Sequence, residues 1–571
     1  MNNSYTLSTV ADQIVFWLQQ KGIDKVFVYP GGTIAPLINS CVQLGVKVEV
    51  FKHEQGAAYA AIAYGRVTGK TQIVMVTSGP GVTNVITPLA DAYYDSTPLL
   101  LITGQVGTSD LCSGRNVRQR GFQETPTTSI VKNISKAVAC PLNAEDALKN
   151  LAELFAVSKA GRQGPTVLDL PVDVQRSKCA TQFPELKSNP VPRNKISNQN
   201  YEEIAKALSQ ARRPVILLGH GALEAGAFET YQDLAEKSKA FVVCSLLGLG
   251  SFSNESERFL GYIGHTGHLV ANEAVHQADF LLALGTRLDL RQTGTMTDSF
   301  VPSGKVAWIN NDPDEIAFPR IKTHWALVGE AGLFATEVLK KINSVAEKDE
   351  IWFNNLKFKR EKSLEDIYEE SNSISPKEVL LKIKELMQTC KGTVVTGVGS
   401  HQQWAARHLS FGPNSWKLLT SGGHGAMGYD LPSAIGASLA SPSEPVLCVV
   451  GDGSLLMNIQ ELASLAERKL FVKILVLNNS RLGIVSQFQK ITWGQDPTTG
   501  DFNSVDFEYI AKGFGISADT VENKDELDRK LEKFWKTKGP YLLNVKIDHA
   551  TEVVPMLLAG QMMDEMWQGH K

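Results

Sequence analysis

Short apolar runs rich in β-branched residues alternate with longer stretches of helical periodicity throughout the chain. Clear examples of the apolar runs are residues 25–30, 72–79, 98–104, 166–171, 214–219, 280–285, 393–399, 445–453 and 472–479. Continuous apolar strands separated by helices are typical of parallel sheets that helices cover on both faces. The pattern therefore predicts an α/β fold built from doubly wound parallel sheets.

Two polar stretches interrupt this alternation. Residues 183–198 carry three prolines among polar residues, a composition typical of an interdomain linker. Residues 345–375 are highly charged, and we expect them to form a connecting segment with some helix. The chain has 571 residues, which is enough for three large α/β units. We therefore predict three domains, at residues 1–182, 199–344 and 373–571.

Composition and charge narrow the functional class. Lys and Arg number 57 against 60 for Asp and Glu, and this balance argues against a protein that binds nucleic acid or membrane surfaces. No apolar run approaches the ~18 residues that a membrane-spanning helix needs. The seven cysteines are scattered without metal-type spacing, as is typical of reduced thiols in a cytoplasmic protein. We therefore expect a cytoplasmic protein without nucleic-acid or membrane partners.

The segment Gly-Asp-Gly-Ser at 451–454 carries the clearest candidate chemistry. Asp452 ends one apolar strand, and Asn479 ends the next strand along the chain. A right-handed crossover places the carboxyl ends of both strands at the same sheet edge, where ligands bind. Carboxylate and amide oxygens suit Mg²⁺, and N–H groups at a helix start favour phosphates. Gly-Asp-Gly alone is compatible with a simple turn, but its pairing with Asn478-Asn479 predicts a Mg²⁺-diphosphate site.

A second motif lies near the amino terminus, where Glu54 opens a helix rich in small residues. An acid in the first turn is often only a solvated residue favoured by the helix dipole. Here YPGG (29–32) precedes it and TSGPGVTN (77–84) follows, and a glycine-rich run with Met427 occupies 421–428. This ordered set resembles the thiamine diphosphate (ThDP) enzymes. Together with residues 118–126, 398–407 and 481–489, it makes the whole chain most similar to the acetohydroxyacid (acetolactate) synthases.

The resemblance implies the roles of individual residues. Glu54 is expected to hydrogen-bond N1′ of the aminopyrimidine, and Met427 to hold the cofactor in a V shape. The implied catalytic residues are Glu54, Gln123, Phe122, Met427 and Phe488. The implied ThDP-binding residues are Pro30, Gly31, Glu54, Asn84, Ser400, His401, Gly425, Met427, Asp452, Gly453, Ser454, Asn479, Gly483 and Ile484. The implied ligands of Mg²⁺ are Asp452, Asn479 and the backbone oxygen of Arg481.

The middle third resembles the flavin-binding segments of the same family. Its glycines do not satisfy GxGxxG, because Glu224 occupies the sixth position, so a nicotinamide-binding fingerprint is absent. The glycines alone are also compatible with plain turns, as in ThDP relatives without a flavin. The resemblance implies an FAD with a structural role, bound by Arg162, Gly219, Gly221, Ser245, Leu246, Gly285, Arg287, Asn310, Asn311 and Glu330.

The implied reaction is the decarboxylation of pyruvate and the transfer of its two-carbon unit to a second carbonyl compound. The chain departs from the family at the acceptor side, with Phe488 where a Trp is usual and Val172 where a Lys is usual. Since anionic 2-keto acids gain most from cationic clamps, the lost Lys weakens that acceptor class, although Arg115 and Arg120 can compensate for the lost charge. The acceptor is therefore left open between a 2-keto acid and a ketone such as a nucleotide-linked keto-sugar.

Two other classes remain: a flavin-dependent pyruvate oxidase, and a non-catalytic subunit that kept the fold. The second is disfavoured because Glu54, Asp452, Asn479 and Met427 are all present. In the family that the chain resembles, active sites are shared between chains. The resemblance therefore implies a homodimer or a homotetramer.

Overall fold

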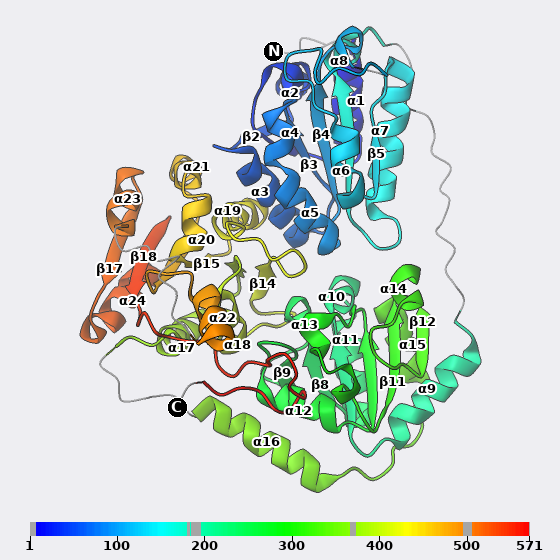
Figure 1. Ribbon diagram of the computed structural model, residues 1–571, viewed down its shortest axis with the longest axis vertical. Helices are drawn as coiled ribbons and strands as arrows, with labels where there is room; N and C mark the ends of the chain where they lie inside the picture. Colours follow the sequence, from blue (N-terminus) through cyan, green and yellow to red (C-terminus); the bar gives the residue numbers. More distant parts are fainter. Residues whose placement is uncertain are drawn as a thin grey trace.

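A computed structural model describes residues 7–112, 114–179, 183, 196–365, 373–494 and 505–569. Within these residues the chain forms three six-stranded sheets, one in each third of the sequence (Figure 1). Every pair of neighbouring strands is parallel, and helices cover the sheets, so the predicted α/β architecture is confirmed. Most of the predicted linker 183–198 lies outside the described residues.

The first domain has the strand order β2-β1-β3-β4-β6-β5. Its strands are β1 (Lys25–Val28), β2 (Lys47–Val50), β3 (Gln72–Val76), β4 (Leu99–Gln105), β5 (Ala137–Ala139) and β6 (Pro165–Pro171). Its helices are α1 (Val10–Gln20), α2 (Ala35–Leu44), α3 (Glu54–Thr68), α4 (Pro80–Asn84), α5 (Ile86–Tyr94), α6 (Thr127–Val131), α7 (Ala144–Lys159) and α8 (Val172–Arg176).

The second domain has the order β12-β11-β10-β7-β8-β9. Its strands are β7 (Pro214–Leu218), β8 (Phe241–Cys244), β9 (Phe259–Tyr262), β10 (Phe280–Leu284), β11 (Lys305–Asn310) and β12 (Trp325–Val328). Its helices are α9 (Asn198–Gln210), α10 (His220–Ala225), α11 (Phe228–Ser238), α12 (Leu269–Gln277), α13 (Leu290–Thr293), α14 (Pro313–Ala317) and α15 (Ala331–Lys341). Helix α16 (Glu350–Glu365) follows, within the predicted connecting segment.

The third domain has the order β14-β13-β15-β16-β18-β17. Its strands are β13 (Thr393–Thr396), β14 (Lys417–Thr420), β15 (Val446–Gly451), β16 (Val472–Asn478), β17 (Ser517–Val521) and β18 (Tyr541–Lys546). Its helices are α17 (Pro376–Met387), α18 (Ser400–His408), α19 (Asp430–Ala440), α20 (Asp452–Met457), α21 (Glu461–Arg468), α22 (Gly483–Trp493), α23 (Phe507–Gly513) and α24 (Leu527–Lys536).

The first and third domains pack together through helices α3 and α19. Both helices are rich in small residues, so their backbones approach closely: a Cβ added at Gly436 would lie 2.7 Å from Ala60 Cα. Beside this contact, buried Glu461 accepts a hydrogen bond from Lys52 N at 3.1 Å. The two domains are therefore held in a close-packed arrangement within one chain.

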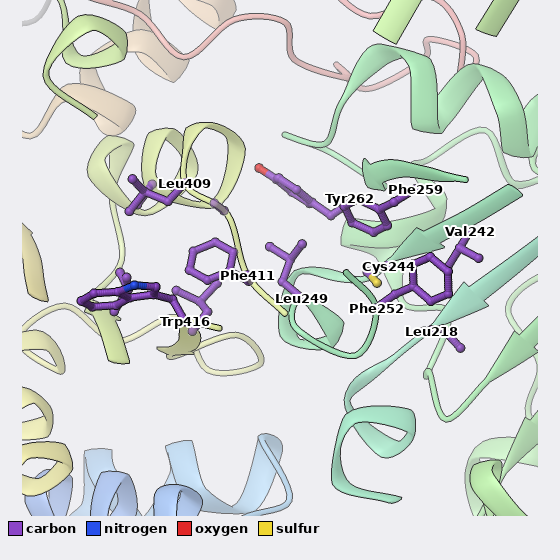
Figure 2. Close-up of a cluster of buried hydrophobic side chains, with 14 of the residues drawn as sticks. Leu218, Val242, Cys244, Leu249, Phe252, Phe259, Tyr262, Leu409, Phe411 and Trp416 are labelled. Atoms are coloured by element: carbon purple, nitrogen blue, oxygen red, sulfur yellow. The ribbon is translucent and has the colours of Figure 1, made fainter. Parts of the chain in front are cut away.

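The second and third domains share a hydrophobic core. Figure 2 shows side chains of β7, β8, β9 and the segment between β8 and β9 next to side chains of the segment between α18 and β14. The contact carries polar links as well, since Tyr262 OH and Thr266 Oγ1 both lie within hydrogen-bonding distance of Gln403 Oε1. Among the described residues, no helix combines the length and the apolar character needed to cross a membrane.

Candidate active site

The edge at the carboxyl ends of β15 and β16 brings together the predicted diphosphate residues. Asp452 directly follows β15, and Asn479 directly follows β16. These strands are neighbours and pair Gly451 with Leu477, so both side chains emerge at the same edge. The predicted juxtaposition of a carboxylate and an amide is therefore present.

Glycines make room at this edge for two further predicted residues. A Cβ at Gly451 would lie 2.8 Å from His401 Nδ1. A Cβ at Gly483 would lie 2.6 Å from Asn479 Nδ2 and 3.0 Å from Ser400 Oγ. Ser400 and His401 open α18, which follows β13, the other neighbour of β15. Residues from the loops after three adjacent strands, β13, β15 and β16, thus lie close together at one edge of the sheet.

Three buried polar atoms at this place lack a hydrogen-bond partner among the described residues: Asp452 Oδ2, Ser400 Oγ and His401 Nε2. Burial raises the pKa of Asp452 to about 6 and lowers the pKa of His401 to about 3. Buried polar groups are normally paired, so this set is poised for a ligand. A carboxylate, a hydroxyl and an imidazole fit a Mg²⁺-diphosphate, because the carboxylate suits the ion and the other two suit phosphate oxygens.

The described part of the chain contains no cluster of three or more His, Cys, Asp or Glu side chains able to hold a metal ion. A Mg²⁺ at Asp452 does not need one. The ion commonly binds to one or two carboxylates and completes its octahedron with phosphate oxygens and water. The donor set at this edge is therefore typical of a metal that arrives together with a diphosphate.

The loop that carries Met427 is tied to helix α20. Gly428 N donates to Ser454 Oγ at 2.9 Å, and Ser454 Oγ donates to Asp430 Oδ2 at 2.5 Å. Asn458 Nδ2 donates to Gly428 O at 2.7 Å. Residues 458–460 separate α20 from α21, so the crossover from β15 to β16 holds two helices. Met427 is half-buried in this loop.

The predicted pyrimidine residues gather in the first domain around the short helix α4. Glu54, only 5% exposed, is the first residue of α3 and accepts a hydrogen bond from Asn84 Nδ2 at 2.9 Å. Gln123 adopts a left-handed backbone (φ 65°) and packs over Gly79, the residue that precedes α4. Gly31 packs against Thr77, with a Cβ position 2.7 Å from Thr77 Oγ1. The hydrogen bond to Glu54 therefore stays within the first domain.

Phe122 and Phe488 lie in different surroundings. Phe122 is 85% exposed at the end of a loop that follows β4. Phe488, on α22, stacks in parallel on His265 of the second domain, with ring centroids 5.5 Å apart and planes 8° apart. His265 Nδ1 lies 2.7 Å from Leu557 O; because a carbonyl only accepts, Nδ1 carries the proton. Burial lowers the pKa of His265, so its ring is neutral with Nε2 as an acceptor.

A cavity of about 350 Å³ lies where the three domains meet. Its lining includes all but one of the predicted flavin residues: Arg162, Gly221, Ser245, Leu246, Gly285, Arg287, Asn310, Asn311 and Glu330. The remaining one, Gly219, lies directly behind this wall, since its Cβ would be 2.6 Å from Thr286 Cα. Glycines without room for a side chain form a cradle, and the arginines suit a diphosphate. The residues present therefore fit an FAD.

Sequence reasoning missed several residues at these sites. Asp95, Gly422, Gly423 and His265 also line the cavity, and none of them is among the residues implied to bind the flavin. Their positions depend on how the domains pack. No local spacing in the sequence predicts that packing, so no sequence signal identifies them.

Comparison with known proteins agrees with this geometry. Three family descriptions match in order: the thiamine pyrophosphate enzyme N-terminal TPP binding domain at residues 8–130, the central domain at 201–340, and the C-terminal TPP binding domain at 397–545. The acetolactate synthase isozyme 2 large subunit of Escherichia coli (strain K12) is 34% identical over 560 residues, covering 97% of this chain and 98% of the relative.

Two further relatives show the same coverage of this chain. The acetolactate synthase large subunit of Haemophilus influenzae is 33% identical over 97% of this chain and 97% of its own. The mitochondrial acetolactate synthase catalytic subunit of Saccharomyces cerevisiae is 34% identical over 96% of this chain and 82% of its own. Ordered domain matches and similarity over nearly the full length show that the chain belongs to the acetolactate synthase family of ThDP-dependent carboligases.

Proposed function

We propose that the chain binds Mg²⁺-ThDP at the edge formed by β13, β15 and β16, and that it joins the two-carbon unit of pyruvate to a second carbonyl compound. The observation that carries the proposal is the set of unpaired buried atoms on Asp452, Ser400 and His401. The thiazolium ring of bound ThDP supplies an electron sink for the loss of CO₂. The protein contributes binding, orientation and the placement of protons.

Each half of the cofactor has its own proposed residues. Asp452, Asn479 and the backbone oxygen of Arg481 hold the metal ion. The phosphates are held by Ser400, His401, Gly453, Ser454, Gly483 and Ile484. Pro30, Gly31 and Asn84 line the pyrimidine pocket, where Glu54 shares a proton with N1′. The carbonyl of Gly425 would orient the 4′-amino group, and the side chain of Met427 would hold the cofactor in its reactive shape.

The two halves come from different domains, and we propose that they meet between two copies of the chain. Two observations support a shared site. The hydrogen bond to Glu54 stays within the first domain, and Phe122, proposed to face the substrate, is 85% exposed in the single chain. A homodimer is the smallest assembly that completes the site, and a homotetramer contains the same contact. Phe122 and Gln123 of one copy then lie near the reacting carbonyl.

The cavity between the domains is the proposed FAD site. The glycine cradle and the arginines support this assignment. Arg162 is held by ion pairs to Asp312 at 3.1 Å and Glu315 at 2.8 Å, so the wall is already organised. The flavin has a structural role here.

Free thiols on all seven cysteines support a reducing, cytoplasmic location.

A 2-keto acid is the proposed acceptor, with the stacked pair of Phe488 and His265 forming one wall of its pocket. Arg115 and Arg120 on the exposed loop supply the positive charge that Val172 lacks. The test is incubation of the purified protein with ThDP, Mg²⁺ and pyruvate, alone and with 2-ketobutyrate or keto-sugars, and identification of products by mass. Acetolactate from pyruvate alone is expected. A product formed only with a keto-sugar would refute the proposal that the acceptor is a 2-keto acid. Oxygen consumption with pyruvate would indicate an oxidase instead.

The role of Glu54 is tested separately. Glu54→Gln is expected to abolish carboligation while ThDP still binds, because the amide keeps the size of the side chain but cannot act as an acid or base near neutral pH. Glu153→Gln, an exposed acid on α7 of the same domain, is the matched control and is expected to leave both unchanged. Undiminished activity of the Glu54 variant would remove this residue from the mechanism.

A further inference from the structure

Two carboxylates on helix α5 and the turn after it reach across from the first domain to a loop of the third domain. Ser421 Oγ donates to Asp91 Oδ1 at 2.6 Å. Gly422 N and Gly423 N donate to the two carboxylate oxygens of Asp95, at 2.9 Å and 2.6 Å. Both acids are buried, with Asp91 only 1% exposed. All three hydrogen bonds cross from the first domain to the third, so the contact is a specific brace.

The brace continues into the loop itself, residues 421–428. The hydroxyl oxygen of Ser421 also accepts hydrogen bonds from Gly425 N at 3.1 Å and Ala426 N at 2.9 Å. Gly425 adopts a left-handed backbone (φ 76°), and its N–H is one of the two groups that Ser421 Oγ holds. Asp91 thus fixes the hydroxyl that in turn fixes the backbone on either side of Gly425.

The same loop borders both proposed cofactor sites. Its first part, Gly422 and Gly423, lines the cavity assigned to FAD, together with Asp95. Its second part contains Gly425 and Met427, assigned to ThDP. Between the two, His424 stacks in parallel on Tyr94 of α5, with ring centroids 5.6 Å apart. A displacement of α5 would therefore reach both sites through one short segment.

Other residues also anchor the start of this loop. Arg66 Nη1 donates to Thr420 O at 2.9 Å, and Gln402 Nε2 donates to Ser421 O at 3.0 Å, so the start of the loop is anchored from two further sides. Burial and the nearby charge of Asp95 raise the pKa of Asp91. An Asn keeps the shape of this side chain and an oxygen that accepts the hydrogen bond from Ser421, so it is a close structural substitute.

We propose that Asp91 and Asp95 are positioning residues that hold the loop 421–428 in the shape needed by ThDP on one side and by FAD on the other. The inference rests on the proposed function, because it concerns the residues assigned to both cofactors. Neither acid touches the reacting atoms. Their effect is transmitted through Ser421 and the backbone of Gly422 and Gly423.

The test compares Asp91→Ala, Asp91→Asn and Asp95→Ala with Asp146→Asn, an exposed acid on α7 of the same domain that serves as the control. The affinities for ThDP and for FAD are measured by fluorescence, alongside kcat, KM for pyruvate and the unfolding temperature without cofactors. Asp91→Ala is expected to weaken ThDP binding and lower kcat, each about tenfold, with KM nearly unchanged. Asp91→Asn is expected to restore most of the loss. Asp95→Ala is expected to weaken FAD binding about tenfold as well.

Ser421→Ala removes the same hydrogen bond by deleting its donor. This variant keeps the test possible if an Asp91 variant does not fold. Because Asp91 acts through Ser421, the double variant Asp91→Ala/Ser421→Ala is expected to lose no more than the worse single variant. Additive losses, or losses in Asp91→Ala that Asp91→Asn does not restore, would overturn the proposal, as would unchanged cofactor affinities. If the unsubstituted protein binds no ThDP, the proposed function itself fails and this inference fails with it.

Discussion

The contact between α3 and α19 provides a sharp test of how domain packing supports the active site. Gly436 on α19 faces the backbone of Ala60 on α3 with no space between them. Gly436→Ala is an otherwise favourable change, since Ala is preferred to Gly in a helix by about 0.5–1 kcal/mol. At this position the sign is expected to reverse, because the added methyl group meets a neighbouring backbone that cannot rotate away.

The size of the effect follows from the geometry. The new Cβ would lie 2.7 Å from Ala60 Cα, whereas ordinary carbon–carbon contacts are about 3.5–4.0 Å. The helices must therefore separate by about 1 Å, and forced overpacking of this kind costs roughly 1–3 kcal/mol. Helix α3 begins with Glu54, and α19 follows directly after the Met427 loop. A shift of this size in a catalytic arrangement lowers kcat by about 100-fold.

Thermal unfolding and pyruvate turnover measure the two consequences. Gly436→Ala is expected to lower the unfolding temperature by several degrees and kcat by one to two orders of magnitude. The matched control is Gly513→Ala at the end of α23, where no atom lies within 4 Å of the added Cβ. That variant is expected to be equally or slightly more stable and fully active. A Gly436 variant that behaves like the Gly513 variant would refute the close helix packing described here.

Four further predictions test the proposed sites. Phe488→Trp is expected to shift mixed pyruvate and 2-ketobutyrate reactions toward the larger acceptor by about tenfold or less, measured as a product ratio by mass. Gly285→Ala is expected to yield protein without flavin absorbance, because the Cβ would lie 2.5 Å from Ala222 N and the backbone is left-handed (φ 61°). Chelation of Mg²⁺ by EDTA is expected to abolish ThDP binding in titrations, with recovery when Mg²⁺ is restored. Burial raises the pKa of Glu461 to about 7, so unfolded chains bind fewer protons than native ones between about pH 4.5 and 7. The free energy of unfolding therefore falls as the pH rises through that window. Relative to the unsubstituted protein, Glu461→Gln is expected to raise the unfolding temperature more at pH 8 than at pH 5.

The parts of the site that sequence could predict are those set by local chain geometry. Asp452 and Asn479 follow adjacent parallel strands, and the crossover rule alone puts them at one edge, where the structure has them. The flavin residues were implied by the family resemblance, and most of them occupy turns directly after strands of the second domain. Parallel sheets gather such turns at one edge, so eight of these residues line one cavity together with Arg162 of the first domain.

Contacts between domains were beyond the reach of sequence reasoning. The pairs Phe488 with His265, and Asp91 with Ser421, join segments that no periodicity or spacing relates. They depend on the exact approach of α3 to α19 and on the core that the second and third domains share. The division of the β15–β16 crossover into two helices arises within the third domain, where Asn458 Nδ2 donates to Gly428 O at the break between α20 and α21.

The buried polar atoms at the edge of β13, β15 and β16 suggest a common role for the contacts between the first and third domains. Asp452 Oδ2, Ser400 Oγ and His401 Nε2 are buried without a hydrogen-bond partner in the part of the chain that the structure describes, and such groups lower the stability of the domain that holds them. Because of this loss of stability, other contacts are needed to hold the loops after β13, β15 and β16 in place before the cofactor binds. The close packing of α3 on α19 and the brace from Asp91 and Asp95 meet that need from the first domain. On this argument the first domain has two tasks: it supplies Glu54, and it holds the diphosphate edge of its own chain in a binding-ready form.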